Sequence, residues 1–216
     1  VKMAVMSQMT GLDNSALLPP YFPVFRGEDL LFGAMVETMH HDGSAIEYGW
    51  SVPHFPIQKK ETHMREPIAA KGGIAMFARY LTERVDYKDA ANPEIRLQTI
   101  AWDLRRMAGR SDSDLIIDYR TQLGQAHGDQ LRHLRSQQAH SHDVGSNNWQ
   151  QYIQRGIDEV MHAINSPHKL SEMTERPLGL TDIEVTERFR ELALGFAAAL
   201  DVWPKIREVC EHKIYK

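Results

Sequence analysis

The sequence has a single cysteine and no long apolar run. Because Cys210 has no second cysteine to pair with, an internal disulfide is excluded, and a reducing, cytoplasmic location is expected. No segment reaches the roughly 18 continuous apolar residues of a membrane span. The opening residues, Val1–Ser7, lack the long apolar core of a signal peptide. These absences predict a cytoplasmic protein without a transmembrane segment.

An excess of positive charge is also missing. The chain has 25 Lys and Arg residues against 29 Asp and Glu residues, a formal net charge of -4. Domains that bind nucleic acid usually carry basic excess, so no nucleic-acid partner is expected. The hydrophobic content of 42% and the charged content of 25% are ordinary for a soluble globular protein. The length of 216 residues allows one large domain or two small ones.

The common motifs of nucleophilic and nucleotide chemistry are absent. There is no G-x-S-x-G elbow, no phosphate-binding loop and no dinucleotide fingerprint. Gly72-Gly73 lies inside a helical pattern rather than after a strand, which disfavours a phosphate role. His140 and His142 lie in a polar loop without the spacing of a helix-bound ligand pair. A surface role is favoured for the histidines of the polar helices, including His127.

The character of the chain changes near residue 60. Residues 1–9 alternate loosely between apolar and polar, which predicts a short strand. Residues 44–55 are rich in β-branched and aromatic residues, which predicts a second strand or an extended loop. Beyond this point the pattern is helical. We therefore expect a mainly α fold, in which a short mixed α/β segment at 1–60 precedes a helical bundle of about five helices at 61–216.

Capping signals set the expected helix boundaries. Asn92 followed by Pro93 starts one helix, and Thr181 with Glu184 three residues on forms a capping box for the last. Gly43 is expected as a left-handed cap, and Pro204 is expected to kink or restart the last helix. The predicted helices are 28–39, 66–84, 92–108, 112–139, 148–165 and 181–203.

The stretch from Leu17 to Gly33 holds the first candidate site. Two prolines and an apolar run lead to Arg26-Gly27, and the acid pair Glu28-Asp29 follows at a helix start. Acids in a first turn suit the positive end of the helix dipole, which is a purely structural interpretation. The functional interpretation is that a fixed loop presents a carboxylate beside Arg26 for acid–base chemistry. Local features leave both open.

A histidine held between two prolines is the second candidate. His54 lies in Val52-Pro53-His54-Phe55-Pro56, close to Trp50, so its backbone is restrained and its neighbourhood is apolar. A neutral imidazole there could ligate a divalent metal, or it could be a core histidine bonded to a carbonyl.

Three segments together resemble a known family. Thr10–Asn14, Leu18–Val24 and the pattern R-G-E-D-x-x-F-G at 26–33 look like the C-terminal half of the catalytic domain in bacterial GT-A glycosyltransferases related to family two. The resemblance covers about residues 1–56. It implies that a nucleotide-sugar donor and an acceptor hydroxyl are the substrates. It implies that Asp29 is the base with Glu28 beside it, that Arg26 and Trp50 contact substrate, and that His54 completes a site for Mn or Mg.

The sequence departs from that family in one respect. The class binds its donor through an N-terminal Rossmann-like half with a metal-binding D-x-D motif, and this sequence has no such half. Asp112-Ser113-Asp114 spells D-x-D but follows Ser111 at a helix start, which favours a capping role. We therefore expect a fragment of a longer transferase, inactive alone.

Two other classes remain open. One is a helical protein–protein interaction module without catalytic activity, whose first 60 residues cap the bundle. The other is a stand-alone metal-dependent hydrolase that uses the histidines, which their spacing supports poorly.

Overall fold

The computed structural model describes residues 11–23, 28–44, 46, 92–141, 147–166 and 181–214. These residues form helices and connectors, and no strand occurs among them. The mainly α prediction is confirmed. The mixed α/β segment is not shown, because both predicted strands and the boundary near residue 60 fall largely or wholly outside the described ranges, as does the predicted helix 66–84. The helices are α1 (Glu28–Met39), α3 (Pro93–Ala108), α4 (Asp112–Ser141), α5 (Asn147–Asn165) and α6 (Asp182–Ile214).

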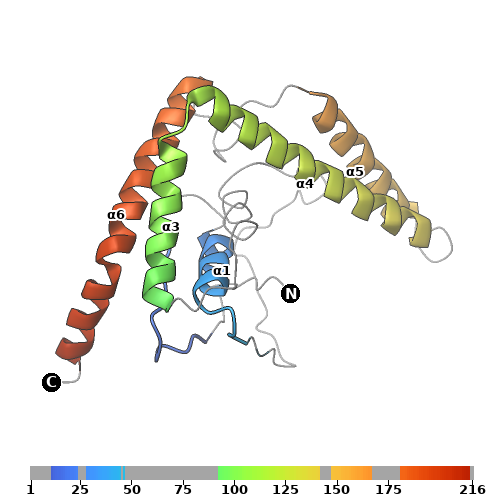
Figure 1. Ribbon diagram of the computed structural model, residues 1–216. Coiled ribbons are helices and arrows are strands. Elements are labelled where there is room, and N and C mark those ends of the chain that lie inside the picture. Colours follow the sequence, from blue (N-terminus) through green and yellow to red (C-terminus); the bar gives the residue numbers. More distant parts are fainter. Residues whose placement is uncertain are drawn as a thin grey trace, which may run out of the picture.

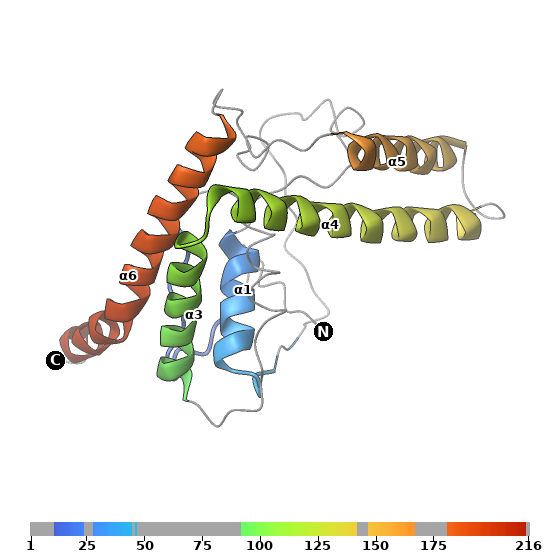
Figure 2. The same cartoon turned by 45° about the horizontal axis from the view of Figure 1, so that its top comes forward.

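The helices form two groups that meet at a corner. α3 lies along α6, and α1 packs against α3 (Figure 1). α4 leaves the end of α3 in a new direction, touches α6 near its start and pairs with α5 (Figure 2). We call α1, α3 and α6 the core unit, and the α4–α5 hairpin the arm.

Local capping explains where α3 and α6 begin. The Asn92 side-chain oxygen accepts the N–H of Ile95 at 2.9 Å, and Pro93 occupies the first turn. At α6 the Thr181 N–H donates to Glu184 at 2.7 Å, and the Glu184 N–H donates to the Thr181 hydroxyl at 3.4 Å. The bond from the Thr181 N–H is also the main reason why the pKa of Glu184 is lowered. Both predicted caps are confirmed.

One prediction about a helix end is wrong. The backbone of Gly43 is not left-handed; its N–H donates to the His40 carbonyl at 2.9 Å and closes a turn. A Cβ at this position would come within 2.9 Å of that carbonyl oxygen, so close approach rather than a positive φ favours glycine. Of the kink or restart expected at Pro204, the restart does not occur, because α6 runs through this residue from Asp182 to Ile214.

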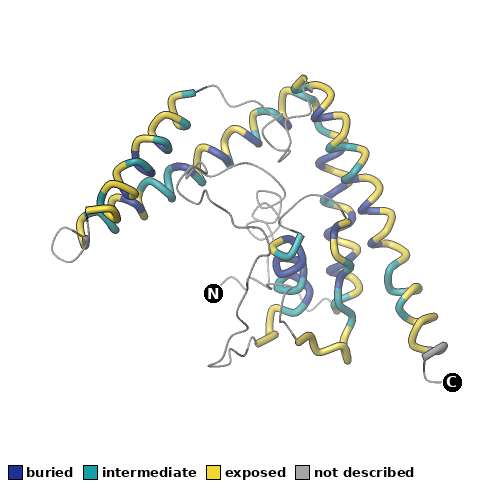
Figure 3. Tube along the Cα trace, turned by 180° about the vertical axis from the view of Figure 1, so that it is seen from behind, coloured by how far each residue is buried: buried dark blue, intermediate teal, exposed yellow. Residues whose placement is uncertain are grey.

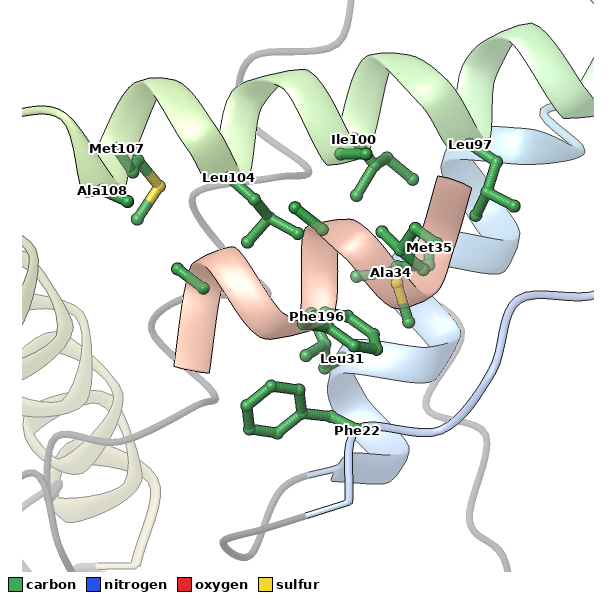
Figure 4. Packing of buried hydrophobic residues seen from close by; sticks show 14 of the residues in the cluster. Phe22, Leu31, Ala34, Met35, Leu97, Ile100, Leu104, Met107, Ala108 and Phe196 are labelled. Atoms are coloured by element: carbon green, nitrogen blue, oxygen red, sulfur yellow. The ribbon is translucent and has the colours of Figure 1, made fainter. Parts of the chain in front are cut away.

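The main hydrophobic core joins the three helices of the core unit (Figure 4). Leu31 and Met35 of α1 meet Leu97 and Leu104 of α3, and all four are at most 1% exposed. Each fully buried side chain of this kind contributes roughly 1.5–3 kcal/mol of hydrophobic stabilisation. From α6 the core receives Ala193, Phe196, Ala197 and Leu200. The buried residues follow the facing sides of the helices (Figure 3).

The arm has a separate small core. Leu134 of α4 packs with Ile153, Ile157 and Val160 of α5, with Leu131 at the edge. A third cluster, Tyr119, Leu123 and Val185, joins α4 to the start of α6. The arm therefore depends on its own apolar contacts beyond the corner.

One arginine fastens the corner. Arg190 of α6 donates through Nε to the Ala108 carbonyl at 3.1 Å and through Nη2 to the Arg110 carbonyl at 2.9 Å. The same guanidinium forms an ion pair with Asp112 at 2.5 Å, and Thr186 donates to that carboxylate at 3.1 Å. The hydrogen bond from Arg190, followed by that from Thr186, lowers the pKa of Asp112. One side chain thus caps the end of α3 and ties it, through the Asp112 carboxylate, to the start of α4.

No helix in the described ranges combines the length and the apolarity that a membrane span requires.

Candidate functional site

The acid pair occupies the first turn of α1. Glu28 and Asp29 are half-buried, and one carboxylate oxygen of Asp29 accepts the N–H of Leu30 at 2.8 Å. The positive end of the helix dipole favours negative charge at this point. Leu31 and Met35, both 0% exposed, pack α1 against the other helices of the core unit. The carboxylates are therefore presented on a firmly packed element.

A phenol lies beside the acid pair. The Tyr21 ring stacks on Phe32, with ring centroids 4.1 Å apart and planes 3° from parallel. Burial raises the pKa of Tyr21, and the charges of Asp29 and then Glu28 raise it further. Because Phe32 lies one helical turn after Glu28 and Asp29 on α1, the stacked Tyr21 ring lies close to the acid pair. We call Tyr21, Glu28 and Asp29 the acid–phenol cluster.

The segment before the cluster is fastened along α6. The Trp203 indole N–H donates to the Leu18 carbonyl at 2.7 Å, and Phe22 meets Phe196 edge-on with centroids 4.9 Å apart. Figure 4 shows Phe22 beside Phe196 and Leu31. Residues 14–22 thus run antiparallel to α6, because Arg207 also binds Asn14. These contacts hold the proline-rich approach that the sequence indicated as rigid.

The other end of α1 is held by two side chains, His40 just beyond the helix and Arg96 of α3. His40 Nε2 donates to the Leu17 carbonyl at 2.7 Å. Arg96 of α3, only 4% exposed, donates through Nη1 to the Thr38 carbonyl at 3.2 Å and to His41 Nδ1 at 2.7 Å. Since a guanidinium only donates, His41 Nδ1 must be the acceptor. Both histidines therefore have structural partners.

The remaining predicted site residues lie outside the described part of the chain. Arg26, Trp50 and His54 are in this group, so the structure neither brings them to the acid pair nor separates them from it. Within the described ranges, no group of three or more His, Cys, Asp or Glu side chains could hold a metal ion. The Mn or Mg site at His54 stays a prediction.

The D-x-D sequence is accounted for by helix capping. The Ser111 hydroxyl accepts the N–H of Asp114 at 3.2 Å and donates to its carboxylate at 2.8 Å. Asp112 pairs with Arg190 at the corner. The capping interpretation of this motif is confirmed.

Sequence reasoning missed two buried ionisable residues. His127 was expected on the surface but is 2% exposed on α4, and Arg96 was not singled out at all. A signal existed for both. His127 lies four residues from Leu123 and from Leu131, and Arg96 lies four residues before Ile100, so each belongs to an apolar stripe at helical spacing.

The acid–phenol cluster can perform one kind of chemistry unaided. A carboxylate at Asp29 can accept a proton from a hydroxyl, and a neutral phenol can hydrogen-bond that hydroxyl and orient it.

Comparisons with protein-family models, curated sequences and solved structures give no match for this chain.

Proposed function

We propose that the chain supplies the acceptor-activating part of an inverting, nucleotide-sugar-dependent glycosyltransferase. Asp29 is the base, Glu28 and Tyr21 orient the acceptor hydroxyl, and Arg26 and Trp50 contact substrate. A divalent cation held with the help of His54 neutralises the leaving diphosphate. A donor-binding half is not recognisable in this sequence, so the proposal includes a second part that binds the nucleotide sugar.

One observation carries the proposal. The acid–phenol cluster stands at the start of a helix whose opposite side is fully buried, and the segment bearing Tyr21 is fastened to α6. A base must be held in a fixed position relative to its substrate, and packing of this kind provides it. A structural cap alone does not require a second, separately anchored segment beside it.

The chemistry follows from these groups. Asp29 takes the proton of the acceptor hydroxyl while the oxygen of that hydroxyl attacks the anomeric carbon of the donor. The bond between that carbon and the diphosphate oxygen breaks, and the diphosphate leaves with the electron pair. The proton ends on the Asp29 carboxylate and passes to water after product release.

The test removes the base without changing its shape. Asp29→Asn is expected to lower transfer at least 100-fold, the size of a general-base contribution, while the circular dichroism spectrum stays unchanged. The assay follows release of nucleoside diphosphate from a panel of donors, with the chain joined or added to its donor-binding half. Asp42→Asn, an exposed acid just beyond the same helix, is the control and should keep full activity. Full turnover in Asp29→Asn would exclude Asp29 as the base.

Nucleotide binding tests the division into halves. Calorimetry with UDP or GDP and manganese should detect binding only when the donor-binding half is present. Tight binding of the nucleotide to residues 1–216 alone would contradict that division.

The arm favours a second candidate, a helical interaction module. It extends away from the core unit (Figures 1 and 2) and carries the exposed ring pair Trp149 and Tyr152, stacked at 5.6 Å. For this candidate, Trp149→Ser should abolish complementation of a strain lacking the gene and Asp29→Asn should not. The transferase proposal predicts that Asp29→Asn abolishes it.

A further inference from the structure

Residues 17–22, which we call the strap, are held by two different helices in turn. The Leu17 carbonyl accepts the Nε2–H of His40, just beyond the end of α1, at 2.7 Å. The next carbonyl, that of Leu18, accepts the indole N–H of Trp203 on α6, also at 2.7 Å. Because a carbonyl only accepts, His40 must carry a proton on Nε2. Two successive carbonyls are thus bound by donors from opposite ends of the sequence.

The same alternation recurs further along the strap, among the rings. Tyr21 stacks on Phe32 of α1, and Phe22 meets Phe196 of α6 edge-on. Figure 4 shows the Phe22 ring beside that of Phe196. Phe22 is only 9% exposed, whereas Tyr21 is 40% exposed. The position of so exposed a ring depends on the backbone that carries it as well as on its one stacked neighbour.

A proline pair joins the bound carbonyls to the phenol. Pro19, which is buried, and Pro20 each have a fixed φ angle, and a residue that precedes proline is kept extended. The chain between Leu18 and Tyr21 therefore has little freedom to bend. An extended chain spans roughly 12 Å over the four positions from Leu17 to Tyr21, so the bound carbonyls lie well away from the phenol.

We infer that His40 and Trp203 are positioning residues for the acid–phenol cluster. By holding two successive carbonyls, they fix the point from which the proline pair carries Tyr21 to its place beside Glu28 and Asp29. They act through the strap and not on the acceptor. The inference rests on the proposed function in one respect, namely that the Tyr21 phenol orients the acceptor hydroxyl.

Titration of the phenol in the whole 216-residue chain tests the positioning without any substrate. His40→Ala removes the donor to the strap, so the Tyr21 ring should gain solvent and move away from the acids, and the pKa of Tyr21 should fall toward its ordinary value. Trp203→Phe should lower it in the same way. His40→Gln keeps an N–H donor at a similar reach and should retain the raised pKa. His133→Ala, the same change at an exposed histidine of α4, is the matched control and should leave the titration unchanged.

Each variant is titrated by ultraviolet absorbance with and without Tyr21→Phe, so that the difference isolates one phenol. Circular dichroism at each pH limits the measurement to the folded chain. A Tyr21 titration that stays the same in both His40→Ala and Trp203→Phe would overturn the inference, because Phe22 alone would then hold the strap in place.

Transfer by the chain with its donor-binding half separates the inference from the proposed function. His40→Ala should lower transfer at least ~10-fold, since small displacements of an orienting group are costly. The same change should cost no more than ~2-fold once Tyr21 is replaced by Phe, because both substitutions act through one phenol. Equal losses in the two backgrounds would overturn the inference. A shifted titration in His40→Ala together with full transfer by Asp29→Asn would support the positioning and overturn the proposed function.

Discussion

At the scale of single residues, Tyr21 reports most directly on the candidate site. Its ring stacks on Phe32. Its pKa is raised mainly by burial and further by the negative charges of Asp29 and Glu28. All three influences favour the neutral phenol over the phenolate. The ionisation of one tyrosine therefore measures whether the acid pair stands beside it.

We predict that Glu28→Gln with Asp29→Asn lowers the pKa of Tyr21 but leaves it above the ordinary tyrosine value, because burial remains. Ultraviolet titration, with Tyr21→Phe subtracted to isolate this phenol, measures the change. Since the folded-state pKa is raised, the associated stability is present below about pH 10 and is lost as the pH rises above it. An unshifted titration in the double variant would show that the acids and the phenol are apart.

At the scale of helices, the arm and the core unit have separate apolar clusters. Ile153 is 1% exposed and contacts only arm residues in its cluster, whereas the core unit is closed by Leu97 and Leu104. Fewer buried side chains hold α5 than hold α3. The two groups are therefore expected to open with different free energies.

We predict that Ile153→Ala loosens the arm by about 2–4 kcal/mol, the usual cost of this truncation in a core. Amide hydrogen exchange should accelerate in α5 and the facing half of α4 while α3 and α6 keep their protection. Gln151→Ala, exposed on the same helix, should change neither group. Equal acceleration in α3 would mean that the molecule opens as one unit.

Much of this helical layout could be predicted from local chemistry. Asn92 before Pro93, Ser111 before Asp114, and Thr181 before Glu184 fix three helix starts through contacts within a few residues. Such signals are legible because both partners of each bond are close in sequence.

The sequence could not reveal contacts between distant residues. Arg190 reads as one charge among many on a polar helix, yet it closes the corner by binding groups about 80 residues away. His127, which was expected on the surface, is buried on α4. The acid pair was visible, but its neighbour Tyr21 was not, because burial and partner choice depend on tertiary packing.

At the scale of the whole molecule, residues 14–22 join the beginning of the described chain to its last helix. The Trp203 indole supplies the central bond of this joint. We predict that Trp203→Phe keeps the ring packing but lowers the free energy of unfolding by about 1 kcal/mol, through loss of the bond to Leu18. Urea denaturation measures the loss. Trp102→Phe, which changes an exposed tryptophan of α3, is the control. An equal loss of unfolding free energy in that variant would show that the bond from Trp203 to Leu18 makes no specific contribution.

The joint also has a consequence for biosynthesis. Leu18 and Trp203 are 185 positions apart, and Asn14 and Arg207 are 193 apart, so neither contact can form until nearly all of this chain has left the ribosome. Closing so long a loop is slow compared with forming helices. The residues of the acid–phenol cluster are thus synthesised early, but the segment that carries Tyr21 docks only after α6 has been made. A chain whose translation stops before α6 would carry the acids without the contacts that hold Tyr21 beside them.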